Sequence, residues 1–231
     1  MNGIKNMLEI TQGQKRAHDG NQPPIKRRAL KYSIGHQIRV NLACEEPSAV
    51  LTSILRIRGY NVDDMWITAL SSSYCKKPTL RQLQDYDNKI LDTIRKNDLE
   101  KLKTLIQEGR SMEACNIHCE TLLHLAGRRA SAAVMSLMLE HVQSVVVDDC
   151  GRTPLHDVCW RFAPNFHVAR AVMDFDPSLM YVRDKYGACP LDYAPPSEWT
   201  SWNFFLHSVK DLYWPQLVVP LKEVGGGGAA G

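Results

Sequence analysis

The 231-residue chain lacks any apolar run long enough to cross a bilayer, so we do not expect it to span a membrane. Residues 1–10 lack the basic-then-apolar order of a secretory signal, and we therefore expect the chain to stay inside the cell. Its seven cysteines are odd in number and form no C-x-x-C pair, which argues against a disulfide framework. In a reducing compartment these thiols are expected to be free.

Charge is distributed unevenly along the chain. Residues 1–40 carry eight Lys or Arg against two acids, whereas residues 41–231 carry 20 against 23. The first segment is also poor in large apolar side chains and contains Gly13, Gly20, Pro23 and Pro24, so residues 1–45 are predicted to be a disordered basic arm. The slightly acidic remainder has no charge that favours direct binding of nucleic acid.

Two basic clusters in the arm, Lys15-Arg16 and Lys26-Arg27-Arg28, are separated by nine residues. This spacing is typical of a bipartite nuclear localisation signal, in which two extended cationic clusters contact two acidic grooves of an import receptor. We therefore expect access to the nucleus, with the protein in the nucleus or in both nucleus and cytoplasm. Two alternatives stay open: a solvated basic tail without a receptor, and an arm that binds the phosphates of nucleic acid.

A tetrapeptide recurs three times in the acidic part of the chain. The intact copy is Thr153-Pro154-Leu155-His156; Thr121-Leu122-Leu123-His124 precedes it by 32 residues, and Cys189-Pro190-Leu191-Asp192 follows it by 36 residues. In the intact copy, threonine suits a helix N-cap and proline suits the first helical position, where its missing N–H costs nothing. The leucine is expected to point into a core, and the histidine to hydrogen-bond back to the preceding turn.

The residues before each tetrapeptide predict a tight turn. Asp148, Asp149 and Gly151 supply it before the intact copy, as Asp184 and Gly187 do before the last copy. Before the first copy Asn116 and Cys119 take the acidic and glycine places, which should weaken that turn.

Apolar residues at i, i+3 and i+4 indicate helices around these motifs. After the tetrapeptides they predict helices over Ser131–His141, Asn165–Phe175 and Ser197–Val209, and before them a pair over Thr79–Asn97 and Asp98–Glu108.

A further amphipathic helix is predicted over Ser48–Arg58, with Ser48 as its N-cap and Gly59 as its end, and another around Asp64–Leu70. We expect both to pack on the N-terminal side of the stack.

Residues from about 88 to 209 resemble an ankyrin repeat domain of roughly three and a half units, on the strength of the Gly151–His156 string and its two echoes. The resemblance implies an all-α solenoid of helix pairs with short finger turns, in which the pair without a tetrapeptide caps the stack. The chain departs from the family at Leu122 and Asp192, and its 36-residue step implies an insertion around Ala163–Asn165 or Asp176–Leu179. The predicted domains are the arm 1–45, an N-terminal helical extension 46–78, the repeats 79–212 and a flexible tail 213–231.

Two groups of residues have side chains that could form a chemical site. Cys115, His118, Cys119 and His124 have the residue types of zinc ligands, but their spacing matches no common finger and His124 belongs to a tetrapeptide. His156, Asp157 and Cys159 could suggest a base and a nucleophile, yet they fall on packed repeat positions without an oxyanion hole or a glycine-rich phosphate cradle. We therefore predict no catalytic, metal or cofactor site, and a protein that is not an enzyme.

Aromatic side chains gather near the C-terminus: Trp199, Trp202, Phe204, Phe205, Tyr213 and Trp214. We expect them to seal the last repeat, whose core edge would otherwise be exposed. The alternative is a short box that recruits a ubiquitin ligase, with Val219-Pro220-Leu221 as a weak candidate. The low-complexity segment Gly225–Gly231 is predicted to be flexible.

The repeat register selects the predicted binding residues. Aligning His124 with His156 pairs Leu125 with Asp157, Arg128 with Trp160, and Arg129 with Arg161. In the ankyrin family these positions line the concave surface together with the finger turns, so we expect one patch made of Arg128, Arg129, Arg152, Asp157, Trp160 and Arg161. Arginine and tryptophan are enriched in interface hot spots and suit an acidic, partly aromatic partner. The alternative is that Trp160 packs on the insertion near Phe162–Phe166 and the arginines are solvated.

The resulting hypothesis is a non-enzymatic protein-interaction module or scaffold with access to the nucleus. The alternative is a substrate-recognition adaptor of a ubiquitin ligase or of another enzyme complex.

Overall fold

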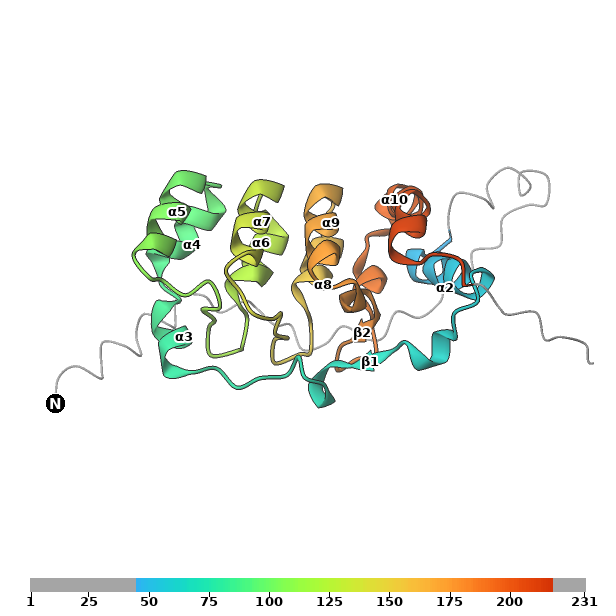
Figure 1. Cartoon of the computed structure of the whole chain (residues 1–231), viewed down its shortest axis with the longest axis horizontal. Helices are drawn as coiled ribbons and strands as arrows, with labels where there is room; N and C mark the ends of the chain where they lie inside the picture. Colours follow the sequence, from blue (N-terminus) through green and yellow to red (C-terminus); the bar gives the residue numbers. More distant parts are fainter. Residues whose placement is uncertain (1–44, 218–231) are drawn as a thin grey trace, which may run out of the picture. The chain divides into compact units, whose positions relative to one another are not determined.

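The structure is a computed structural model that describes residues 45–217 (Figure 1). The predicted localisation signal at residues 15, 16 and 26–28 and the Val219-Pro220-Leu221 run lie outside the described residues. The described part is mostly helical, as expected for an all-α chain. Its α-helices are α2 (Pro47–Ile57), α3 (Leu80–Asp85), α4 (Asn88–Arg95), α5 (Leu99–Gln107), α6 (Leu122–Arg129), α7 (Ala132–Leu139), α8 (Pro154–Cys159), α9 (Phe166–Phe175) and α10 (Trp199–Tyr213).

Short elements join these helices. Two strands, β1 (Ile67–Thr68) and β2 (Val182–Arg183), pair in parallel, with Ile67 opposite Val182. Single turns of 3-10 helix occur at η2 (Val62–Asp64), η3 (Ala69–Ser71), η4 (Pro177–Tyr181), η5 (Pro190–Tyr193) and η6 (Pro196–Glu198).

Consecutive helix pairs lie side by side (Figure 1). The first helices α4, α6 and α8 pack in one row, and the second helices α5, α7 and α9 pack in another. The row of first helices continues with η5, which packs on α8. Leu123, Leu155 and Leu191, which are the third residues of the tetrapeptides, are all at most 3% exposed, so the core runs continuously between the pairs.

The second helices begin where the sequence predicts. Ser131 and Asn165 are the N-caps of α7 and α9, and their side chains accept hydrogen bonds from the N–H groups of Val134 and Val168. The predicted helix over Thr79–Asn97 is wrong, because two helices replace it. Asp87 caps α4 by accepting from Ile90 N at 3.1 Å, so a second helix begins here after α3 has ended.

The extra residues of the 36-residue step fall in both predicted places. α7 begins 11 residues after Thr121, whereas α9 begins 13 residues after Thr153. The remainder lies after α9, where η4 forms.

Close packing between the first helices depends on Gly127. A Cβ atom at this position would lie 2.7 Å from the carbonyl oxygen of Pro154, which is backbone and has little freedom to withdraw. The absence of a side chain therefore lets α6 approach α8.

The N-terminal helix occupies the opposite end of the stack from the one expected. α2 packs on α10 and η5 at the C-terminal end, not on the N-terminal side. Its buried face of Val50, Leu51, Ile54 and Leu55 covers the last apolar surface of the stack. Ser48 is not its N-cap, because the helix begins one residue earlier, at Pro47. The helix predicted around Asp64–Leu70 is also wrong: that segment holds η2, β1 and η3.

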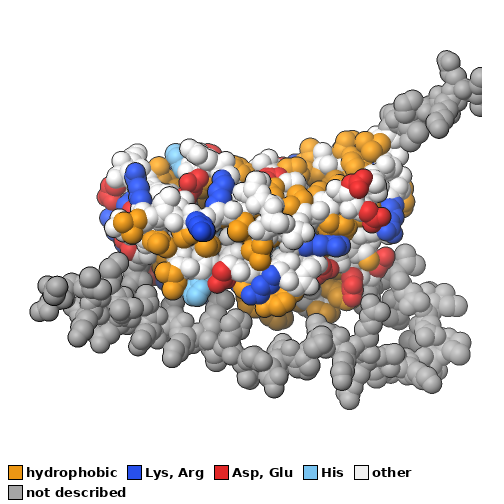
Figure 2. Space-filling view, turned by 90° about the horizontal axis from the view of Figure 1, so that it is seen from below, with side chains coloured by type: hydrophobic (Ala, Val, Ile, Leu, Met, Phe, Trp, Pro, Cys, Tyr) orange, Lys and Arg blue, Asp and Glu red, His pale blue; other side chains and the backbone are white. Residues whose placement is uncertain are grey.

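Residues 59–79, which we call the strap, run from α2 back to α3 beneath the finger turns (Figure 1). Along the way β1 pairs with β2, Tyr74 O accepts from Val147 N at 3.0 Å, and Lys76 Nζ donates to Ser144 Oγ at 2.6 Å. An extended chain of this length spans up to about 70 Å, enough to run the length of a small domain. Viewed from the finger side, acidic, basic and apolar side chains are interspersed on this face (Figure 2).

The C-terminal aromatics seal the stack together with α2. Trp202, Phe205 and Trp214 are buried, whereas Phe204 is 78% exposed. The expected flexible tail does not begin at residue 213, because Tyr213 ends α10 and Leu217 N donates to Arg58 O at 3.0 Å. Arg58 adds a hydrogen bond to Trp214 O at 2.7 Å and an ion pair with Asp211, which joins the first described helix to the last.

Candidate protein-binding surface

The tight turn before each tetrapeptide, which we call its finger turn, is held by one side-chain oxygen. Asp148 Oδ1 accepts from the N–H groups of Cys150 and Arg152, at 2.9 and 2.8 Å, and Asp184 does the same for its own turn. Asn116 Oδ1 takes this part before the first tetrapeptide. The position that is Gly151 and Gly187 in the later turns has φ of +81°, and Cys119 adopts +59° in its place. Sequence reasoning therefore placed these turns correctly.

Each tetrapeptide histidine joins its own turn to the next unit. Nδ1 of His156 accepts from the backbone N–H of Thr153 at 3.0 Å and lies 2.9 Å from its hydroxyl. Nε2 of His156 donates to Ala188 O at 3.3 Å, and Nε2 of His124 donates to Arg152 O at 2.8 Å. Burial lowers the pKa of His156 to about 4, so the ring stays neutral near pH 7.

The last copy replaces this histidine without losing the helix start. Asp192 Oδ2 accepts from Cys189 N at 2.8 Å. Tyr193 then lies edge-on to His156, with ring centroids 5.3 Å apart, and its hydroxyl donates to Asp184 at 2.5 Å. The tetrapeptide residues are therefore structural in all three copies.

Two of the predicted binding residues form an internal ion pair. Arg128 Nη1 donates to Asp157 Oδ2 at 2.8 Å, and its Nη2 pairs with Glu120. Asp157 is only 6% exposed. Burial raises the pKa of Asp157, while His124 and Arg128 act in the opposite direction. This cluster joins α6 to α8 and to the finger turn before α6. Arg128 and Asp157 therefore stabilise the surface and are not free to contact a partner.

Arg152 is also engaged within the molecule. Its Nε and Nη2 contact Asp148 Oδ2 at 2.8 and 2.6 Å, across the finger turn. The Asp148 carboxylate raises the pKa of Arg152 in spite of burial, and Arg152 in turn lowers the pKa of Asp148. The side chain is 30% exposed, which leaves part of it at the surface.

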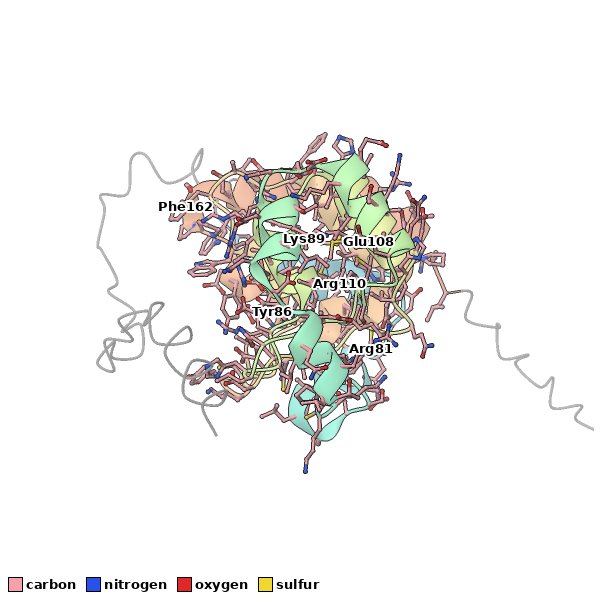
Figure 3. All side chains as sticks on the ribbon, turned by 90° about the vertical axis from the view of Figure 1, so that its left-hand side faces the viewer. Arg81, Tyr86, Lys89, Glu108, Arg110 and Phe162 are labelled. Atoms are coloured by element: carbon pink, nitrogen blue, oxygen red, sulfur yellow. The ribbon has the colours of Figure 1, made fainter. Side chains whose placement is uncertain are left out.

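The remaining predicted residues are available to a partner. Trp160 ends α8 and is 49% exposed; Phe162, two residues later, is 77% exposed and projects from the molecule in Figure 3. Arg129 is exposed at the end of α6. Arg161 Nη1 is buried without a hydrogen-bond partner, and burial followed by the charge of Arg129 lowers the pKa of Arg161. We call Arg129, Trp160, Arg161 and Phe162 the cationic–aromatic surface.

Phe162 was not among the predicted binding residues. The signal that could have found it is its place in residues 160–165, the lengthened connection between α8 and α9. A large apolar side chain that is exposed in a lengthened connection is a mark of an interaction site.

The structure also places the residues weighed for metal binding and catalysis. His118 Nδ1 lies 2.9 Å from Asp149 Oδ2, and the one close group of ligand atoms within residues 45–217 is Asp148, Asp149 and Cys150, in a finger turn. Asp148 already accepts from Cys150 and Arg152 there. Burial raises the pKa of the Cys159 thiol well above its usual value, so it stays protonated beside a histidine whose nitrogens are both hydrogen-bonded.

No helix between residues 45 and 217 is long and apolar enough to cross a bilayer. No protein-family model matches the chain, and no curated protein matches it.

Proposed function

We propose that the chain is an ankyrin-repeat protein that acts as a non-enzymatic protein-interaction module. Three features support the repeat assignment: tetrapeptides at nearly constant spacing, helix pairs stacked in two rows, and histidine bonds repeated 32 residues apart. In a stack of this kind the first helices and fingers present a surface that extends over several units, which suits the binding of another protein.

The observation that carries the interaction proposal is the exposure of Trp160 and Phe162 beside Arg129 and Arg161. Neither of these two arginines forms an ion pair within residues 45–217, in contrast to Arg128 and Arg152. Two aromatic side chains exposed close together, beside guanidinium groups without an ion pair, are typical of a surface that binds another protein.

The partner that fits this surface is an acidic segment with an apolar or aromatic side chain. The lowered pKa of Arg161 reports a guanidinium that is partly desolvated and repelled by Arg129. A carboxylate placed between the two guanidinium groups would accept charge-assisted hydrogen bonds from both. The apolar side chain of the partner would pack between Trp160 and Phe162.

Access to the nucleus is the second part of the proposal. It rests on the spacing of Lys15-Arg16 and Lys26-Arg27-Arg28, whose partner would be an import receptor.

A pull-down from cell extract tests the interaction. The variant Trp160→Ala/Phe162→Ala is expected to lose the proteins that the wild type recovers, because it removes both aromatic anchors. Phe204→Ala is the matched control, since Phe204 is equally exposed but lies on α10. Equal recovery by wild type and the double variant, or equal loss in the Phe204 variant, would place the interface elsewhere.

A further inference from the structure

A cleft of about 360 Å³ lies between α2, the β1–β2 pair and the start of η5, away from the cationic–aromatic surface. Its α2 wall is a polar stripe, because Ser48, Thr52 and Arg56 are spaced four residues apart and so share one helix face. The opposite apolar face of α2 is buried against α10 and η5. The cleft therefore exists only because the N-terminal helix packs at the C-terminal end of the stack.

The facing wall carries a preorganised cation. Arg183 lies on Trp66, with its guanidinium carbon 4.0 Å from the centre of the indole ring. Stacking uses the face of the guanidinium and leaves its N–H groups free in the plane, where they can bind an oxyanion by two parallel hydrogen bonds. The strand pairing of Arg183 and Thr68 fixes the backbone beneath this stack.

Among residues 45–217 the two arginines of the cleft have no ion-pair partner. Neither Arg56 nor Arg183 forms an ion pair with any carboxylate of residues 45–217. The one acid that lines the cleft, Asp192, accepts from Cys189 N and caps η5. Two positive charges against one negative charge leave the cleft able to take an anion.

We propose that this cleft binds a phosphate monoester dianion. Two guanidinium groups on facing walls, together with the hydroxyl of Ser48 on the α2 wall, offer hydrogen-bond donors from more than one direction. The Thr52 hydroxyl is not among them, because it donates to Ser48 O at 2.9 Å. A phosphate has three acceptor oxygens and a charge near −2 above pH 6, so it matches this donor set better than a planar, singly charged carboxylate does. Its source is either a phosphorylated side chain of another protein or a small free phosphate compound.

Titration of the whole chain with phenyl phosphate and with inorganic phosphate tests the proposal. The signal is the NMR resonance of the Trp66 indole N–H, and acetate is the probe for a simple carboxylate. Both phosphate probes are expected to shift this resonance saturably, and each is expected to bind more weakly below its own second pKa, where the dianion takes up a proton. Tighter binding of phenyl phosphate indicates a phosphorylated side chain as the source, and equal binding indicates a free phosphate compound.

Variants assign the binding to the two guanidinium groups. Arg183→Gln and Arg56→Gln are each expected to weaken phosphate binding about tenfold, the usual effect of losing a charge-assisted hydrogen bond. Arg95→Gln, which removes an exposed arginine of α4 outside the cleft, is expected to leave binding unchanged. The proposal is overturned if the Trp66 resonance does not respond, if acetate binds as tightly as phosphate, or if the cleft variants bind as the wild type does.

Discussion

Replacing Arg128 with methionine should destabilise the protein, because it leaves the buried carboxylate of Asp157 without its cation. Arg128 pairs with Glu120 and Asp157, and Asp157 is 6% exposed. Glu120 is more exposed and also accepts from Asn116 Nδ2, so it retains a partner. The Asp157 carboxylate would keep its charge without its guanidinium. Removing one partner of a buried ion pair costs about 3–5 kcal/mol, and the partial exposure of Arg128 places the expected loss near about 3 kcal/mol.

The double variant Arg128→Met/Asp157→Asn separates this cause from lost packing. If the uncompensated charge is responsible, the neutral amide should restore more than half of the loss. Urea unfolding at pH 7.5 gives the free energies, and the four proteins complete a double-mutant cycle.

The pH dependence gives a second, independent check. Burial already raises the pKa of Asp157, and removal of Arg128 should raise it further. An acid whose pKa is higher in the folded state than in the unfolded state favours folding when it is protonated. This contribution to stability is lost as the pH rises through the folded-state pKa. The deficit of Arg128→Met relative to wild type should therefore shrink as the pH falls from 7.5 to 4.5. A loss below about 1 kcal/mol, or a deficit that neither acid nor Asp157→Asn reduces, would refute the reasoning.

Three further predictions concern other parts of the chain. The pKa of His156 is about 4 in the folded state and near 6.5 in the unfolded state, so the unfolding free energy of the wild type should fall by up to about 3 kcal/mol as the pH drops from 6.5 to 4. Urea titrations should show a smaller fall for His156→Gln. Cys119 has φ of +59°, so Cys119→Gly should relieve backbone strain and raise the unfolding free energy by about 1 kcal/mol. A decrease would mean that packing of the thiol stabilises the fold by more than the backbone strain costs. Changing Lys26, Arg27 and Arg28 to alanine should move a fluorescent fusion out of the nucleus without altering the melting temperature of the folded unit, and a wild-type fusion absent from the nucleus contradicts the signal.

Local features of the fold could be predicted from the sequence because their causes are local. The turn, the N-cap and the histidine bonds of Asp148–His156 lie within a few residues of one another, and the helix starts at Ser131 and Asn165 follow from their own side chains. Even the break between α3 and α4 had a local signal, since Asp87 can cap a helix as well as Thr79 does.

The position of α2 could not be predicted in the same way. Its apolar face indicated that it would pack, but not where, and sequence order favoured the neighbouring α3–α5 end. The apolar face of α10 is the surface that needs cover, and the strap is long enough for the N-terminal helix to reach it. Contacts between residues as distant as Arg58 and Trp214 leave no local pattern.

The surroundings of the proposed binding residues could be predicted only in part, because they depend on contacts between distant segments. The repeat register placed Arg128 and Trp160 at equivalent positions, but it could not show that Arg128 meets two carboxylates while Trp160 meets water. The cleft that joins Arg56, Trp66 and Arg183 comes from three distant segments and was not foreseen.

Site-specific photo-crosslinking in cells tests the central claim most directly. A photoreactive phenylalanine analogue would replace Trp160 in one protein and Phe204 in another; both are exposed aromatics, one at the end of α8 and the other on α10. The account predicts that position 160 yields a discrete crosslinked partner, that position 204 does not, and that Arg129→Glu abolishes the product. Crosslinking at position 204 alone, or a product at position 160 that persists in Arg129→Glu, would contradict it.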